Sequence, residues 1–270
     1  MSTFQQQPMH IHFNDSYHQG ESVIHRLDPR TKILIAVGFI LTVSLTPVGL
    51  FDLYLALFVM VMAVAVGSGI GAGLVLKRAF VALPFALAAV ALPFTMPGEV
   101  IAVVPIFGGI DVTLEGTVRA LSIMVKSWIS VQAAIVLITL TPFHDLLWGL
   151  GELHVPRPII AIVSFMYRYL FVLSDEVLRL LRARASRAAA MPGVRSGGPL
   201  LWRGKVAGYM AGGLMLRSFD RSERIYNAMA ARGYDGEIRS FTQRHFHTAD
   251  FVAGGIAGVV LVSILLLAYR

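Results

Sequence analysis

The chain has 270 residues, of which 56% are hydrophobic and only 14% are charged, whereas soluble domains contain about 25% charged residues. Its net charge is +7, and it contains no cysteine, which excludes disulfides, thiolate nucleophiles and cysteine-ligated metal or iron–sulfur sites. This composition excludes an ordinary soluble enzyme. It favours an all-α integral membrane protein, because helices satisfy their own backbone polar groups in lipid.

Residues 1–32 are predicted to form a cytoplasmic amphipathic leader. This segment contains four of the eight histidines, and it does not have the apolar core of a cleaved signal peptide. Arg26, Arg30 and Lys32 precede the first apolar run, which places this flank in the cytoplasm by the positive-inside rule. The histidines could bind a transition metal through imidazole nitrogens. Their spacing is not diagnostic, and incidental histidines in a solvated leader are the favoured interpretation.

Residues 33–141 are predicted to contain the first four transmembrane helices. The apolar segments are near the roughly 20 residues that cross a bilayer as a helix. They lie at 33–51, 53–76, 79–98 and 118–141, and a last transmembrane helix is predicted at 251–270. Lys77 and Arg78 form a second cytoplasmic flank, whereas 97–117 contains acidic but no basic residues and is predicted to be external. The glycine-rich run 67–73 is expected to let helices pack closely.

The segment 142–250 is predicted to be a cytoplasmic or interfacial coupling region. Between Arg179 and His247 it contains 13 Lys and Arg but only four Asp and Glu. Aromatic residues do not alternate with these charges as a base-stacking surface requires. The basic block is therefore expected to meet anionic lipid or an acidic protein surface, and no nucleic acid.

Two long amphipathic helices are predicted within this region. The first covers 158–190 and lies at the membrane interface, and the second covers 205–232, after a breaker rich in proline and glycine at 191–204. These helices and five membrane spans make up the predicted architecture. If 158–174 instead crosses the bilayer, the number of spans rises to six, and the basic block lies outside, against the positive-inside bias.

An arginine between small residues lies near the end of each of these helices. The two motifs are Ala183-Arg184-Ala185 and Ala231-Arg232-Gly233. A guanidinium group flanked by small side chains can enter a groove on another protein and bind carboxylates with two hydrogen bonds. Each arginine alone could simply stabilise a helix C-terminus, which is worth about 0.3–1 kcal/mol. Two such arginines on successive helices favour docking onto partner proteins.

The second helix also has a predicted charged face, formed by Arg217, Arg221 and Arg224. Asp220 lies four residues before Arg224, a spacing that favours an ion pair.

No catalytic or nucleotide-binding motif accompanies these arginines. Neither HExxH nor GxSxG occurs, and the segment 198–206, GPLLWRGKV, has five residues between its glycines and Val after the Lys. A Walker A loop needs four residues there, and then Ser or Thr. We therefore predict that this chain holds no cofactor and binds no ATP through a P-loop.

Two segments resemble a known family. The motif Leu27-Asp28-Pro29-Arg30-Thr31-Lys32 before the first span resembles a signature of the transmembrane T component of energy-coupling factor transporters. Residues 216–236, LRSFDRSERIYNAMAARGYDG, are similar to the CbiQ branch of that family, which serves cobalt or nickel uptake. The resemblance covers essentially the whole chain, from the leader to the last span.

The resemblance implies a non-catalytic coupling subunit in the bacterial inner (plasma) membrane. Its implied partners are two CbiO-like ABC-type ATPases, which hold ATP and magnesium, a CbiM-like substrate-binding membrane subunit, and a small accessory membrane subunit. By position, Arg184 would enter one ATPase groove and Arg232 the other. The first motif reads Ala-Arg-Ala, where the family more commonly has Ala-Arg-Ser or Ala-Arg-Gly.

Two other functional classes remain as alternatives. A self-sufficient secondary carrier or channel would need ionisable groups near the bilayer midplane, and Lys126 and Arg168 are the candidates. An intramembrane enzyme has no paired carboxylates or nucleophile motif to support it. The sequence does not distinguish cobalt from nickel.

Overall fold

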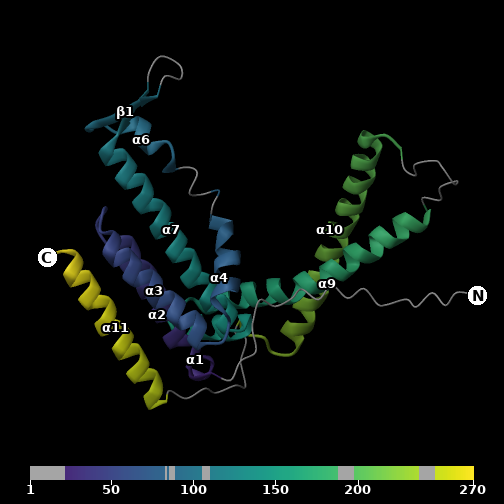
Figure 1. Cartoon of the computed structure of the whole chain (residues 1–270). Coiled ribbons are helices and arrows are strands. Elements are labelled where there is room, and N and C mark those ends of the chain that lie inside the picture. The colour runs from purple at the N-terminus through teal and green to yellow at the C-terminus, as the bar shows by residue number, and fades with distance from the viewer. Residues whose placement is uncertain (1–21, 83, 85–88, 105–109, 188–197, 237–246) are drawn as a thin grey trace, which may run out of the picture. The chain divides into compact units, whose positions relative to one another are not determined.

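The computed structural model describes residues 22–82, 84, 89–104, 110–187, 198–236 and 247–270. The described chain is almost entirely helical, as the sequence predicts, and it divides into two compact units. The membrane unit contains the described residues up to His154 and those from His247 onward. The two-helix unit contains those from Val155 to Gly236. Figure 1 labels most of the elements of both units.

The motif before the first apolar run forms the start of α2 (Pro29–Leu45), which follows the short α1 (Val23–Arg26). Asp28 is the N-cap residue, and its side chain accepts a hydrogen bond from the backbone N of Arg30 (2.9 Å). This bond satisfies one of the backbone donors that a helix start leaves unpaired. Pro29 occupies the first helical position, where its fixed φ suits the helix and its missing N–H is not needed. Asp28 and Pro29 therefore determine where α2 begins.

The second predicted span is divided into two helices. A turn separates α3 (Phe51–Gly67) from α4 (Ala72–Ala79), and in this turn Gly69 and Gly71 have φ values of +78° and +82°. Glycine adopts such angles without the strain that a side chain causes. A Cβ added at either glycine would meet nothing within 4 Å. The expected close helix packing at 67–73 is therefore wrong, because these glycines form a turn.

The segment predicted to be external contains a small β-hairpin that the sequence did not indicate. The hairpin consists of β1 (Val100–Val104) and the antiparallel β2 (Ile110–Thr113). A 3₁₀ turn (Phe80–Ala82) and the short helix α6 (Leu92–Thr95) precede it in the chain. The backbone N of Glu99 donates to Glu115 Oε2 (2.9 Å), which fastens the residues before β1 to the helix that follows the hairpin. The third predicted span, 79–98, lies partly outside the described residues.

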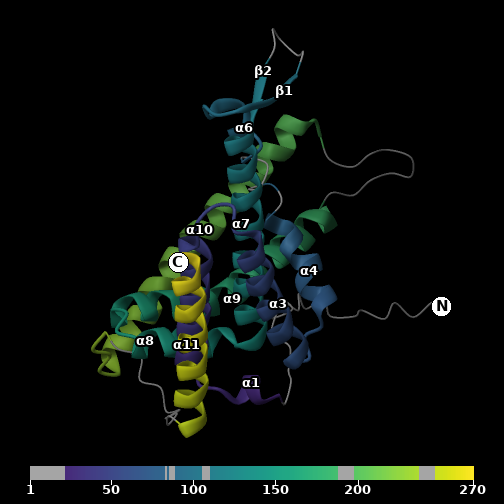
Figure 2. The ribbon, with the colours of Figure 1, turned by 60° about the vertical axis from the view of Figure 1, so that its left-hand side comes forward.

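The core of the membrane unit lies where α2, α3 and α7 (Leu114–Leu140) meet. Helix α11 (Thr248–Ala268) packs along α2, and α4 packs against α7. Figure 2 shows the axes of α3, α7 and α11 roughly aligned with one another. The short α8 (Phe143–Glu152) follows α7 and contacts α2. The fully buried core side chains include Val43, Tyr54, Leu57 and Ile129.

The two-helix unit consists of α9 (Arg157–Arg187) and α10 (Leu200–Ala231). The single continuous helix predicted over 158–190 is confirmed as far as Arg187, where the described residues end. Helix α10 begins five residues earlier than predicted, because Pro199 occupies the N-cap position, just before the first turn. Residues 200–204 of the predicted breaker are therefore helical.

Three described helices, α7, α9 and α11, are long and apolar enough to cross a membrane. Helices α2 and α3 have 17 residues each, at the lower limit of the roughly 17–25 residues typical of a membrane span. Length and composition therefore admit α9 both as an interfacial helix and as a sixth span.

Two buried aspartates join distant parts of the membrane unit. The backbone N of Asp28 donates to Asp250 Oδ1 (2.7 Å), although the two residues are 222 positions apart in sequence. The backbone N of His247 donates to Asp250 Oδ2 (2.9 Å). Asp28 and Asp250 are only 6% and 3% exposed. One carboxylate therefore accepts hydrogen bonds from backbone donors at the starts of both α2 and α11.

Basic residues hold further helix ends at the same junction. Lys32 Nζ donates to the carbonyl oxygens of His25 (2.9 Å) and Leu140 (3.4 Å), the latter at the C-terminus of α7. A cation suits this position, because the last carbonyls of a helix have no partner within it. Arg30 pairs with Glu152 of α8 (2.9 Å). The predicted basic flank thus connects α2 to α7 and α8.

We expect Asp250→Asn to lower the free energy of unfolding of the detergent-solubilised protein by about 1–3 kcal/mol. An amide group presents only one acceptor oxygen, so one of the two backbone donors, from Asp28 or His247, loses its partner. Denaturant unfolding followed by tryptophan fluorescence measures this change. The matched control is Asp52→Asn, since Asp52 is exposed on α3. Equal stability of the two variants would contradict the structural role of Asp250.

Candidate docking site

Helix α10 ends in a backbone arrangement that places Arg232 at its C-cap. The backbone N of Gly233 donates to Ala230 O (3.0 Å), and the N of Tyr234 donates to Met229 O (3.0 Å). This pair of bonds is the Schellman motif, which needs a left-handed residue just after the cap. Gly233 supplies it with a φ of +78°. The predicted end of this helix at 232 is therefore confirmed, with Arg232 as the C-cap residue.

The side chain of Arg232 projects from this end without a structural task. Arg232, Ala231 and Gly233 are all exposed. Among the described residues, none forms a hydrogen bond or ion pair with the Arg232 guanidinium group. The carbonyls at the end of α10 bond to backbone N–H groups instead. The interpretation of Arg232 as a simple side-chain cap is therefore not supported, and its five donors remain available.

Arg184 lies in the last described turn of α9, between the exposed Ala183 and Ala185. It is partly exposed, and no described residue forms a hydrogen bond or ion pair with it. The neighbouring Arg182 behaves differently, because its Nε donates to the carbonyl of Leu178 in the same helix (3.3 Å). Arg184 and Arg232 therefore share one property, a guanidinium group that the described chain does not use.

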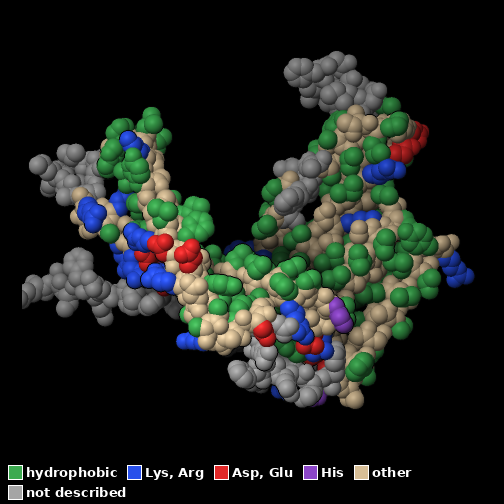
Figure 3. Space-filling view, turned by 180° about the vertical axis from the view of Figure 1, so that it is seen from behind, with side chains coloured by type: hydrophobic (Ala, Val, Ile, Leu, Met, Phe, Trp, Pro, Cys, Tyr) green, Lys and Arg blue, Asp and Glu red, His purple; other side chains and the backbone are tan. Residues whose placement is uncertain are grey.

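The three arginines of the predicted charged face of α10 differ in their contacts. Arg217 Nη1 forms an ion pair with Glu176 Oε1 of α9 (3.0 Å), so Arg217 faces the other helix of the unit. Arg224 Nε donates to the backbone carbonyl of Asp220 (3.2 Å), which replaces the predicted contact with the Asp220 carboxylate. Arg221 is partly exposed. Figure 3 shows basic side chains gathered with acidic ones on the two-helix unit.

Lys126, one of the two ionisable candidates for a carrier mechanism, has a structural task in the membrane unit. Its Nζ donates to the carbonyl oxygens of Thr46 and of Ser44 (3.3 Å), and lies 5.7 Å from the centre of the Tyr54 ring. Thr46 is the C-cap of α2, so Lys126 satisfies carbonyls that the helix end leaves free. The other candidate, Arg168, is exposed on α9 in the two-helix unit.

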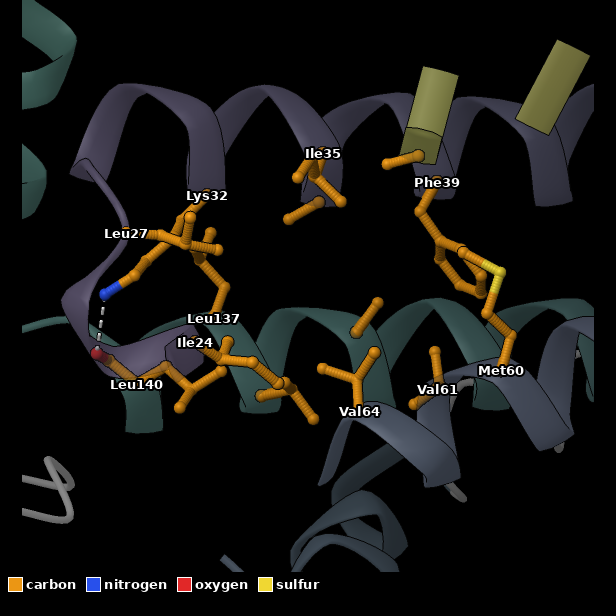
Figure 4. Close-up of a pocket in the computed structure, with 14 residues that line it drawn as sticks. Ile24, Leu27, Lys32, Ile35, Phe39, Met60, Val61, Val64, Leu137 and Leu140 are labelled. Carbon is orange, nitrogen blue, oxygen red and sulfur yellow. Dashed lines mark hydrogen bonds between the residues drawn. The ribbon is translucent and has the colours of Figure 1, made fainter. Parts of the chain in front are cut away.

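A cavity of about 220 Å³ lies between α1, α2, α3, α7 and α11 of the membrane unit. Its walls are apolar side chains, among them Phe39, Met60 and Leu137, together with Lys32 at one end. Figure 4 shows Lys32 turned toward the end of α7, where it bonds to Leu140. The lining contains no imidazole or carboxylate group of the kind that transition-metal ions prefer.

Within the described residues, no group of three or more His, Asp or Glu could hold a metal ion. The histidines at positions 10, 12 and 18 lie outside the described residues, so the alternative of a metal site in the leader stays a prediction. His25 is described, and its Nδ1 lies 2.7 Å from Ser22 Oγ.

The sequence did not single out Glu176 and Asp250. Glu176 lies three residues before Arg179, a helical ion-pair spacing that could have indicated it. Asp250 lies in the first turn of α11, and an acidic residue at that position is a local sign of a helix start. The local sequence does not indicate that Glu176 pairs with Arg217 or that Asp250 accepts from Asp28.

The sequence matches the CbiQ family of cobalt transport proteins over residues 20–243. An uncharacterized protein of Methanocaldococcus jannaschii is 28% identical over 71% of this chain and 65% of its own length. The nickel permease LarQ of Lactiplantibacillus plantarum is 32% identical over 48% of this chain and 44% of its own length. The energy-coupling factor transporter transmembrane protein EcfT of Ruminiclostridium cellulolyticum is 27% identical over 94% of this chain and 96% of its own length.

The chain thus spans less than two thirds of the first two relatives and nearly all of the third. The matched family region includes α9 and α10 with both arginine motifs. Three described helices are long and apolar enough to cross a bilayer. This chain therefore belongs to the CbiQ family of cobalt transport proteins and is a multi-pass protein of the plasma membrane.

Proposed function

We propose that this chain is the transmembrane coupling subunit of an ATP-driven energy-coupling factor importer for cobalt or nickel ions. In this function it is not a catalyst. Two CbiO-like ATPase subunits bind ATP and magnesium, and a CbiM-like membrane subunit binds the metal ion. The observation that supports this proposal most directly is the pair of exposed motifs around Arg184 and Arg232, whose guanidinium groups bond to no described residue. The similarity to EcfT over nearly the full length gives independent support.

The chemistry of docking follows from the two motifs. An arginine presents five donors in a planar fork, which matches a carboxylate with two parallel hydrogen bonds. The small neighbours Ala183, Ala185, Ala231 and Gly233 leave space for the walls of a groove around each fork. Two arginines on one unit match two ATPase subunits, with one arginine for each.

The two helices suit the transmission of movement. Helices α9 and α10 have 31 and 32 residues, which is about 45–50 Å at 1.5 Å per residue. A displacement at the arginine end of such a helix moves the rest of it as well. Large apolar side chains along α10 are exposed, for example Leu201 (88%), Tyr209 (70%) and Phe219 (57%). An exposed apolar surface of this kind fits a membrane subunit as a partner.

We expect the amount of ATPase that co-purifies with the tagged protein in mild detergent to fall at least tenfold in the double variant Arg184→Ala/Arg232→Ala. Each single variant should lose less, because one docking contact remains. Metal-ion uptake by cells that produce the complex should fall less in each single variant than in the double variant.

The matched control for this experiment is Arg182→Ala, which removes the same charge from α9 but a side chain that bonds to its own helix. Full ATPase recovery with the double variant would contradict the proposed docking. Metal transport by the purified chain alone in liposomes would instead favour the self-sufficient carrier or channel, with Arg168 as the first residue to test.

Gly233→Ala tests whether the backbone conformation at the end of α10 fixes the orientation of Arg232. The substitution keeps the arginine but strains the left-handed conformation by roughly 1 kcal/mol or more. We expect weaker ATPase co-purification than with the wild type. The matched control is Gly213→Ala in the interior of α10, where an added Cβ meets nothing within 4 Å. An equal effect of both substitutions would contradict the role of Gly233.

A further inference from the structure

The two long helices of the two-helix unit are linked by an ionic contact around Glu176 of α9. Glu176 Oε1 lies 3.0 Å from Arg217 Nη1 of α10, and Glu176 Oε2 lies 3.5 Å from Arg179 Nη2 of α9. Each carboxylate oxygen therefore faces a different guanidinium group. Figure 1 shows α9 and α10 crossing each other within this unit.

Glu176 is shielded much more than its partners. Its side chain is 16% exposed, whereas those of Arg217 and Arg179 are 57% and 66% exposed. A carboxylate that is largely removed from water interacts more strongly with a nearby cation than an exposed one does. It also loses more when that cation is absent, because its charge is then left poorly solvated. The contact thus favours the helix arrangement in which Arg217 reaches Glu176.

The contact lies at a distance from both docking arginines. Glu176 precedes Arg184 by eight residues, about 12 Å along α9, and Arg217 precedes Arg232 by 15 residues, about 22 Å along α10. A helix is stiff over this length. If α10 rotates by about 10° about its contact with Glu176, Arg232, which lies about 22 Å away along the helix, moves by about 4 Å. A hydrogen bond tolerates only a few tenths of an ångström. The docking geometry is therefore sensitive to the angle between α9 and α10.

We infer that Glu176 is a positioning residue, which fixes the angle between α9 and α10 through Arg217 and thereby sets the spacing of Arg184 and Arg232. This inference rests on the proposed coupling function and deepens it. Glu176 itself touches neither an ATPase nor the transported ion. Its partner Arg217 acts inside the unit, in contrast to the two docking arginines.

The absence of cysteine makes a direct test simple. Cysteines introduced at two exposed positions, Ser186→Cys on α9 and Asn227→Cys on α10, accept nitroxide labels without background. Pulsed electron paramagnetic resonance then measures the distance between the helices in the full-length protein in detergent. The variants are Glu176→Gln and Arg217→Gln. Asp175→Asn is the matched control, since Asp175 is the exposed acidic neighbour of Glu176.

We expect both variants to change the distance distribution between the two labels, by a shift of its mean or by at least a doubling of its width. Asp175→Asn should leave the distribution unchanged. In unlabelled complexes the same two variants should lower metal uptake at least threefold. The melting temperature of Glu176→Gln should stay close to that of the wild type, because this variant leaves no shielded charge and the freed Arg217 and Arg179 are mostly exposed. A charge exchange, Glu176→Arg with Arg217→Glu in an Arg179→Ala background, should restore the narrow distribution.

A wild-type distance distribution in Glu176→Gln would overturn the inference, and so would a charge exchange that fails to restore the distribution. These outcomes are separate from a failure of the proposed function. The function fails if the double variant of Arg184 and Arg232 retains its ATPases, whatever the measured distances. If the double variant loses its ATPases but the distances do not respond to Glu176, only the positioning role is wrong.

Discussion

The membrane unit depends on one constraint, which is that backbone groups at helix ends need partners where water is excluded. Lipid offers no hydrogen bonds, so each end must be satisfied by the protein itself. Asp250 accepts from the starts of α2 and α11, Lys32 donates to the end of α7, and Lys126 donates to the end of α2. These few charged residues hold the ends of otherwise apolar helices in register.

The C-terminus of α10 in the two-helix unit is satisfied differently. The Schellman motif closes α10 with backbone groups alone, so no side chain is needed there. Arg232 is therefore free of the structural work that Lys32 and Lys126 perform in the membrane unit. The contrast explains how one chain uses basic residues in two ways: as partners for carbonyls within the membrane unit, and as available donors in the unit proposed to dock.

Much of this architecture could be predicted from sequence because it depends on local patterns. Long apolar runs predict the helices, and Asp28-Pro29 and Gly233 mark helix ends through backbone preferences that act within a few residues. The continuous α9 was predicted for the same reason. The arginine motifs were visible because their neighbours in sequence are also their neighbours in space.

The features that sequence reasoning missed depend on contacts between distant segments or on backbone angles. Asp250 binds a residue 222 positions away, and Glu176 binds a residue on a different helix. The run 67–73 was misinterpreted because small residues suit both close packing and left-handed turns. Only the φ values of Gly69 and Gly71 decide between the two. The hairpin β1–β2 was missed because a short apolar segment predicts a strand and a helix equally well.

The Schellman ending of α10 also determines how the sequence can vary. Gly213 lies within α10 and Gly233 follows its end, and only Gly233 has a positive φ. At position 213 an added Cβ meets nothing within 4 Å, so alanine fits there without strain. At position 233 every possible replacement adds a Cβ to a left-handed residue. Among relatives, glycine should therefore be replaced by other residues much more often at position 213 than at position 233.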